Sequence, residues 1–156
     1  MKSERGQSLV ELAISLVILL YLLSGAVEFG IIFFQYVQIR DAAQEGALYG
    51  SMHADEPAKI IARAGDASDK PIDLDVDPRV TIDVYIDDDP SDTSHGYHHS
   101  ADAINYNAYN CEGHGLKVVV EYKHKIFMPF LPKLIGRTEI PLHGIVTDTI
   151  LNPFDC

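Results

Sequence analysis

The pattern of hydrophobic residues divides the chain into a long apolar beginning and a mixed remainder. From Leu12 to Val27 the sequence contains no charged residue and is interrupted only by two serines. The apolar stretch continues to Phe34 if Glu28 is tolerated within it. Because about 20 apolar residues span the hydrocarbon core of a bilayer, we expect a membrane span over about residues 9–34.

The helical pattern continues beyond this apolar stretch. Residues 35–53 contain no proline, and apolar or small residues recur there at helical spacing. The pattern predicts a single helix from about Leu9 to about Ser51. At 1.5 Å per residue it is roughly 65 Å long, about twice the hydrocarbon thickness of a bilayer. The outer half of the helix must therefore pack against protein.

Small residues mark one face of that outer half. Ala42, Gly46 and Gly50 recur at positions i, i+4 and i+8. Small residues at this spacing allow another backbone to approach closely. Two interpretations remain open: the face packs against other helices in a filament, or it packs beneath the head domain of its own chain.

The remainder of the chain predicts a small head domain. A second helix begins after Asp55 and Glu56, because acidic residues and proline favour the first turn of a helix. Alternating, β-branched segments predict strands, and residues 129–132 (PFLP) interrupt the pattern. Residues 87–115 show almost no apolar periodicity, and a loop of this length is uncommon unless it has a function. The expected head elements are a helix from Pro57 to about Ala67 and strands over Val80–Ile86, Leu116–Met128 and Thr138–Leu151.

These elements predict an α+β protein: a long N-terminal transmembrane or filament helix, then a small head with a second helix and an antiparallel sheet. The expected divisions are a leader at 1–6, the long helix at 7–53 and the head at 54–156.

Charge indicates the orientation of the chain. Lys2 and Arg5 precede the apolar helix, whereas Arg40 after it is accompanied by Asp41 and Glu45. The positive-inside rule places the N-terminus in the cytoplasm and everything after about residue 38 outside it. The net charge of −11 argues against a nucleic-acid partner, because there is no basic stripe to neutralise phosphates.

The two cysteines lie in the part expected outside the membrane, where disulfides persist. We expect a bridge between Cys111 and Cys156, which would stabilise the fold by about 4 kcal/mol on the chain-entropy model. Free or intermolecular thiols are the alternative.

The N-terminus also carries a processing pattern. Gly6 is followed five positions later by Glu11, at the start of the apolar helix. Glycine, four residues, glutamate and an apolar helix form the pattern of a type IV prepilin leader. An ordinary secretory signal does not fit, because the apolar run is too long and lacks a small-residue cleavage site after it. A plain membrane anchor is the alternative, but it has no need of a charge within the span, which is costly.

Three segments carry a resemblance to the TadE-like pilus-assembly proteins of tight-adherence (Flp-type) systems. They are residues 6–11 (GQSLVE), 27–30 (VEFG) and 42–49 (AAQEGALY). The end of the chain, 118–150, resembles the family more loosely, whereas the acidic loop 87–115 has no recognisable counterpart. The resemblance implies a pilin or pseudopilin, processed after Gly6 by a prepilin peptidase and assembled by a membrane platform with an ATPase.

Two carboxylates on the long helix are candidate assembly residues. Cleavage after Gly6 would leave Gln7 with a free amine. Glu11 in a low dielectric needs a cation, and the amine of an adjoining subunit is a candidate. Glu28 lies deeper in the expected span. It would serve a contact within the assembly, be protonated because of desolvation, or form a hydrogen bond to a neighbouring helix.

The acidic segments raise the question of calcium, which takes six to eight oxygen ligands. Asp73, Asp75 and Asp77 alternate, but the EF-hand pattern fails because Pro78 occupies the position that requires glycine. A solvated acidic surface is the expected explanation, and no cofactor is predicted. The candidate calcium ligands are Asp87, Asp88, Asp89 and Asp92, and the histidines of a conceivable transition-metal site are His95, His98, His99 and His114.

Motifs of the common enzyme classes are absent from the sequence. We therefore expect a structural subunit, anchored and polymerised through its helix, whose exposed acidic head serves surface attachment. Its partners would be other pilin subunits, the peptidase, the platform with its ATPase, and membrane lipid before assembly. The alternative is an uncleaved, membrane-anchored binding module that uses the Asp/His-rich loop to bind a metal or a glycan.

Overall fold

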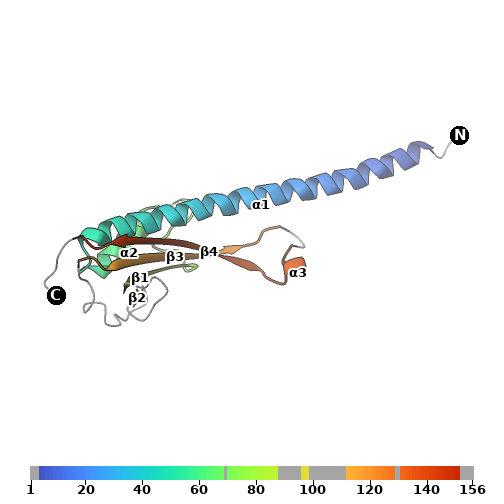
Figure 1. Ribbon diagram of the computed structural model, residues 1–156. Helices are drawn as coiled ribbons and strands as arrows, with labels where there is room; N and C mark the ends of the chain where they lie inside the picture. The colour runs from blue at the N-terminus through green and yellow to red at the C-terminus, as the bar shows by residue number, and fades with distance from the viewer. Residues whose placement is uncertain (1–3, 69, 88–95, 99–111, 129–130, 152–156) are drawn as a thin grey trace.

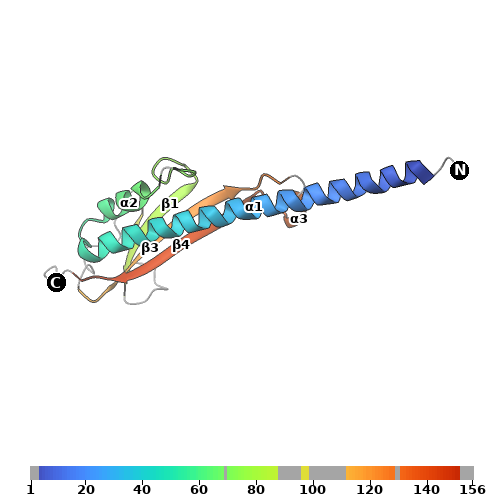
Figure 2. The same cartoon turned by 90° about the horizontal axis from the view of Figure 1, so that it is seen from above.

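The computed structural model describes residues 4–68, 70–87, 96–98, 112–128 and 131–151. A helix, α1 (Glu4–Met52), runs the length of the molecule, and a small head is packed along its C-terminal half (Figure 1). The N-terminal half of α1 extends beyond the head (Figure 2). The predicted α+β class, with a long apolar helix, a second helix and an antiparallel sheet, is confirmed.

The head contains a second helix and a sheet. Helix α2 (Pro57–Asp66) begins at the predicted proline and buries Ile60, Ile61 and Ala64. The sheet has the strand order β2-β1-β3-β4 and is antiparallel throughout. Its strands are β1 (Val80–Asp87), β2 (Gly96–His98), β3 (Gly115–Lys125) and β4 (Glu139–Thr149).

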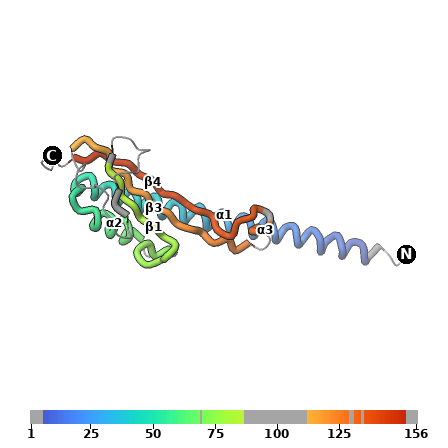
Figure 3. The backbone as a smooth tube through the Cα atoms, turned by 90° about the horizontal axis from the view of Figure 1, so that it is seen from below, coloured from blue at the N-terminus to red at the C-terminus, as the bar shows by residue number. Residues whose placement is uncertain are grey.

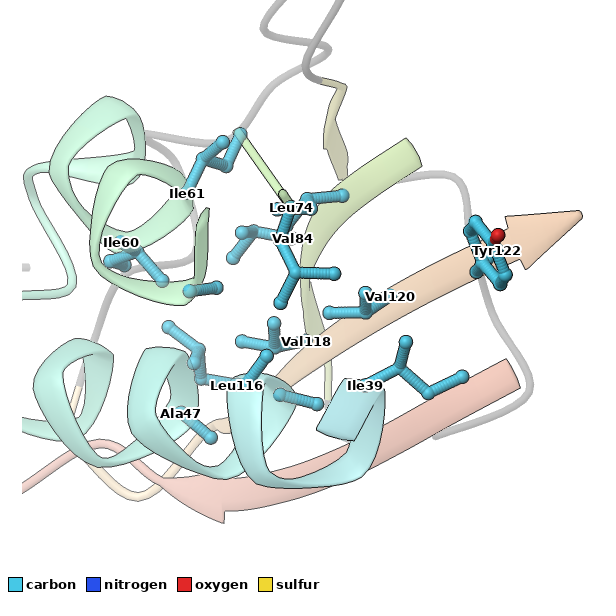
Figure 4. Packing of buried hydrophobic residues seen from close by; sticks show 14 of the residues in the cluster. Ile39, Ala47, Ile60, Ile61, Leu74, Val84, Leu116, Val118, Val120 and Tyr122 are labelled. Carbon is cyan, nitrogen blue, oxygen red and sulfur yellow. The ribbon is translucent and has the colours of Figure 1, made fainter. Parts of the chain in front are cut away.

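Alternation along the strands determines which face of the sheet is buried. On β3, every second residue from Leu116 to His124 is buried, and Ile126 and Met128 continue this pattern beyond the strand. The buried face packs against α1 and α2, and the strands β3 and β4 run along α1 (Figure 3). Figure 4 shows the core between these layers, which is aliphatic apart from Tyr122. Its labelled members are Ile39, Ala47, Ile60, Ile61, Leu74, Val84, Leu116, Val118, Val120 and Tyr122.

Three details differ from the predicted elements. The segment 87–115 is not a loop throughout, because Gly96–His98 pairs with β1 as a short edge strand. Strand β3 ends at Lys125, before the predicted Met128. The interruption after it contains a short helix, α3 (Leu131–Ile135), followed by Gly136 with a φ of 70°. Glycine adopts this left-handed conformation without steric cost, and it commonly terminates helices.

One close approach joins α1 to the sheet. A Cβ added to Gly144 of β4 would lie 2.6 Å from the carbonyl oxygen of Ile39 and 2.9 Å from the amide nitrogen of Arg40. Both of those atoms belong to the backbone of α1. Strand β4 therefore lies directly on the helix at a point where only glycine fits.

Candidate membrane and assembly site

Helix α1 has two different environments. The side chains of residues 6–23 are all exposed, although most are apolar. From Ser24 onward, one side of the helix is covered by the head. Helix α1 is long and apolar enough to cross a membrane. The large exposed apolar side chains before the head begins are Leu9, Val10, Leu12, Ile14, Leu16, Val17, Ile18, Leu19, Leu20, Tyr21, Leu22 and Leu23.

The head first meets the helix at the end of the β3–β4 hairpin. Met128 is buried, and its methyl carbon would lie 3.5 Å from a Cβ at Gly25. The uncovered part of α1, residues 6–23, is roughly 27 Å long at 1.5 Å per residue. This length is close to the roughly 30 Å of the hydrocarbon core. On the uncovered face, apolar side chains continue beyond the hairpin with Phe29, Phe33 and Phe34.

Glu28 is bound by the head of its own chain. Only 6% of the residue is exposed. Its Oε1 atom lies 2.9 Å from Nε2 of His124, and it accepts a hydrogen bond of 3.0 Å from the backbone N–H of Phe127. His124 is fully buried, and its ring lies edge-on to the ring of Phe127. The sequence did not predict that Glu28 contacts the head of its own chain. The structure shows this contact.

His124 is a site residue that the sequence analysis missed. It lies on the buried face of β3, two residues after Tyr122 in the same alternation. A buried polar side chain requires a hydrogen-bond partner. The alternating pattern therefore contained a signal that His124 points inward to a polar group, and Glu28 is that group.

Glu11, the other candidate carboxylate, is exposed on the uncovered part of α1. Its Oε1 accepts a hydrogen bond of 3.3 Å from the side-chain amide of Gln7, one helical turn away. Gly6 lies within the same continuous helix, with no atom near a Cβ built on it. Gln7 and Glu11 are thus on one face of α1, and both residues are exposed.

The small-residue face is buried beneath the head. A Cβ at Gly46 would lie 3.0 Å from Ala64 of α2 and 3.3 Å from Val118 of β3, and Ala42 is fully buried. At Gly50 the nearest contact, with Leu116, would be 2.7 Å. Of the two interpretations left open by the sequence, packing under the chain's own head is the one observed. These three residues offer no surface to a neighbouring subunit in this conformation.

The first group of aspartates has a structural role. Asp73 Oδ1 accepts hydrogen bonds from the backbone N–H groups of Asp75 and Val76, closing a turn. Asp77 forms two side-chain hydrogen bonds with Arg79, and this guanidinium lowers the pKa of Asp77 below its ordinary value. In the described part of the chain, no group of three or more acidic, histidine or cysteine side chains is placed to hold a metal ion.

Several predicted site residues lie outside the described residues. Among the candidate calcium ligands, Asp87 is the last residue of β1, and the others fall outside the described ranges. Of the histidines, His98 is in β2 and His114 directly precedes β3. Those outside the described ranges are Asp88, Asp89, Asp92, His95, His99 and both members of the expected disulfide, Cys111 and Cys156.

The N-terminal part of the chain matches a known protein family. Residues 6–48 match the family described as TadE-like protein, as the resemblance predicted. The match covers the uncovered apolar segment, the Glu28 region and most of the helix beneath the head. No curated protein and no solved structure matches the chain. The match indicates a protein associated with a Tad pilus.

Proposed function

Because residues 6–48 are TadE-like, we propose that the chain is a structural subunit, a pilin or pseudopilin, of a type IV-like Tad pilus. The observation that carries this proposal is the uncovered part of α1, residues 6–23. Its side chains are mostly apolar, and all of them are exposed. A surface of this size requires a nonpolar environment. Lipid provides that environment before assembly, and the helices of other subunits provide it in the filament.

In the membrane-bound state, the N-terminus is cytoplasmic and the head is extracytoplasmic. The head covers one side of α1 from Ser24 onward, so we place the fully lipid-surrounded part of the span at residues 6–23. This is shorter than the span of 9–34 expected from hydropathy. Glu28 then lies beyond the lipid-surrounded part, where His124 and Phe127 of the head bind it. Residues 29–34 have one side covered by the head. Their other side faces lipid headgroups or a neighbouring subunit.

Processing after Gly6 would release the amine of Gln7. We propose that this amine pairs with Glu11 of an adjoining subunit as the subunit enters the filament. The exposure of Glu11 on the uncovered half of α1 supports this role. The side chain of Gln7 within the same chain, at 3.3 Å, is a weak partner for a carboxylate. A cation in a low dielectric would be a far stronger one.

The other proposed partners follow from the same assembly cycle. A prepilin peptidase would remove the leader, and a membrane platform with an ATPase would extract the subunit. The head, in a chain with a net charge of −11, would form the pilus surface and serve attachment to surfaces. In this account the chain has no catalytic role.

Fractionation of native cells tests the proposal. We expect the wild-type chain in both the membrane fraction and the material sheared from the cell surface. Glu11→Ala should remain in the membrane and be depleted from the sheared material. Glu45→Ala is the matched control, because Glu45 is an exposed carboxylate on the same helix and should not alter the distribution.

The outcomes separate two claims. Absence of the wild-type chain from sheared material would contradict the role as a filament subunit. Equal amounts of wild type and Glu11→Ala there would contradict the role of Glu11 alone.

A further inference from the structure

The end of the β3–β4 hairpin has an unusual combination of side chains. Phe127 is 70% exposed, and Ile135 of α3 is also exposed. Lys125, Lys133 and Arg137 are exposed around them. We call these five residues the tip surface. Large apolar side chains among basic ones are typical of protein segments that lie at a membrane interface.

The charge of the tip surface differs from that of the whole chain. Between Glu121 and Glu139 the sequence contains Lys123, Lys125, Lys133 and Arg137 and no acidic residue. Glu139 lies opposite Lys125 in the β3–β4 register and offsets part of this charge. No ion pair involving these four bases is found in the described part of the chain. In a chain with a net charge of −11, the hairpin end is thus a local cationic region.

The tip surface lies close to the point where the uncovered part of α1 ends. Phe127 donates its backbone N–H to Glu28, and Met128 contacts Gly25, where the uncovered part of α1 ends. Figures 1 and 2 show the hairpin directed toward the N-terminal part of α1, with α3 at the end of the hairpin. If the uncovered segment crosses a bilayer, the tip surface is held at the level of the lipid headgroups.

We propose that the tip surface binds anionic phospholipid at the extracytoplasmic membrane surface around α1. The bases would contact phosphate groups, and Phe127 and Ile135 would enter the boundary between headgroups and acyl chains. The inference rests on the proposed membrane insertion of α1. It assigns the hairpin a role in fixing the head against the membrane before the subunit is extracted.

The test uses the absence of tryptophan from the chain. Single variants Phe127→Trp, Val76→Trp and Leu16→Trp of the full chain are reconstituted in phosphatidylcholine vesicles, with or without phosphatidylglycerol. Lipids brominated in their acyl chains quench a tryptophan that contacts them. Val76 is the matched control, because it is 71% exposed but lies in the aspartate-rich turn. Leu16 reports insertion of α1.

We expect Leu16→Trp and Phe127→Trp to be quenched and Val76→Trp to remain unquenched. Quenching of Phe127→Trp should increase with phosphatidylglycerol. Lys133→Gln and Arg137→Gln are then added to the Phe127→Trp variant. Each base removed should weaken binding of the tip surface to the membrane by about five-fold. High salt should have a similar effect, because it screens exposed charges.

Each contrary result has a distinct meaning. Quenching of Leu16→Trp without quenching of Phe127→Trp overturns the tip proposal and leaves the membrane helix intact. Quenching of neither variant overturns membrane insertion and the tip proposal together. Quenching of Phe127→Trp that is insensitive to phosphatidylglycerol and to loss of the bases overturns the assignment of anionic lipid.

Discussion

At the scale of single residues, Glu28 joins the two parts of the molecule. It lies on α1 close to the end of the uncovered apolar segment. Its partner His124 belongs to β3, and its partner Phe127 directly follows that strand. A buried carboxylate is costly unless it is paired and hydrogen-bonded. The head supplies both needs through His124 and Phe127. Glu28 thereby fixes where along α1 the hairpin ends.

The Glu28 contact is tested by substitution. Glu28→Ala should lower the free energy of unfolding of the chain in detergent micelles by about 2–4 kcal/mol, because the buried ring of His124 and the backbone N–H of Phe127 lose their partner. Glu28→Gln should cost less, since its amide oxygen still accepts a hydrogen bond. Glu45→Ala, which removes an exposed carboxylate 3.8 Å from Arg63, should cost at most about 1 kcal/mol. Equal losses for Glu28→Ala and Glu45→Ala would contradict the role of Glu28.

Gly144 tests the contact between β4 and α1. Gly144→Ala would place a methyl group against the backbone at Ile39 and Arg40, which cannot move without displacing the helix. We expect a loss of about 1–3 kcal/mol or more in the free energy of unfolding. Gly30→Ala is the control: nothing lies within 4 Å of its added Cβ, so the higher helix propensity of alanine should leave stability unchanged or slightly increased. A Gly144→Ala variant as stable as Gly30→Ala would show that the close approach is absent in solution.

At the scale of elements, the single helix α1 consists of two segments with different surroundings. Its N-terminal half is apolar on all sides, whereas its C-terminal half has one face buried in the core of the head, with Ile39, Ala43 and Ala47. Helices that are apolar all round belong in a membrane or in the centre of an assembly. The change occurs near Gly25, where the hairpin reaches the helix.

The two halves should respond differently to charge. Leu16→Lys with Leu20→Lys places two charges in the proposed span, at a cost of about 5–7 kcal/mol for insertion. We expect this variant to be extracted from cell membranes by alkaline carbonate, unlike the wild type. Leu48→Lys with Val76→Lys changes two residues that are more exposed than Leu16 and Leu20 but lie outside the proposed span, and this variant should remain in the membrane. Retention of both variants to the same degree would contradict the proposed span.

The sequence predicted the elements with strong periodicity. Helix α1 and the strands β1 and β4 have nearly their expected bounds, because alternation and helical spacing are repeated many times within them. β2 and α3 were missed. Three residues cannot show a period, and α3 follows a proline that also signals a break. The Glu28–His124 contact joins residues 96 positions apart, so only the inward position of His124 was accessible from the local pattern.

At the scale of the whole molecule, the head and the uncovered helix face different surroundings. The head lies along one half of α1, and the other half extends beyond it (Figure 1). This shape allows the N-terminal part of α1 to be surrounded by lipid and later by other helices. The head covers the small-residue face of α1. Contacts between subunits would therefore have to use the N-terminal part of α1 and the exposed side chains of Phe29, Phe33 and Phe34.

The most direct test of this account is the intact mass of the chain in material sheared from the surface of its native cells. We expect a mature chain that begins at Gln7. Its mass should also rise by two hydrogens on reduction if Cys111 and Cys156 form the expected bridge. A chain in its native cells that retains Met1 to Gly6 and is found only in the membrane would contradict the pilin account and favour an uncleaved anchored module.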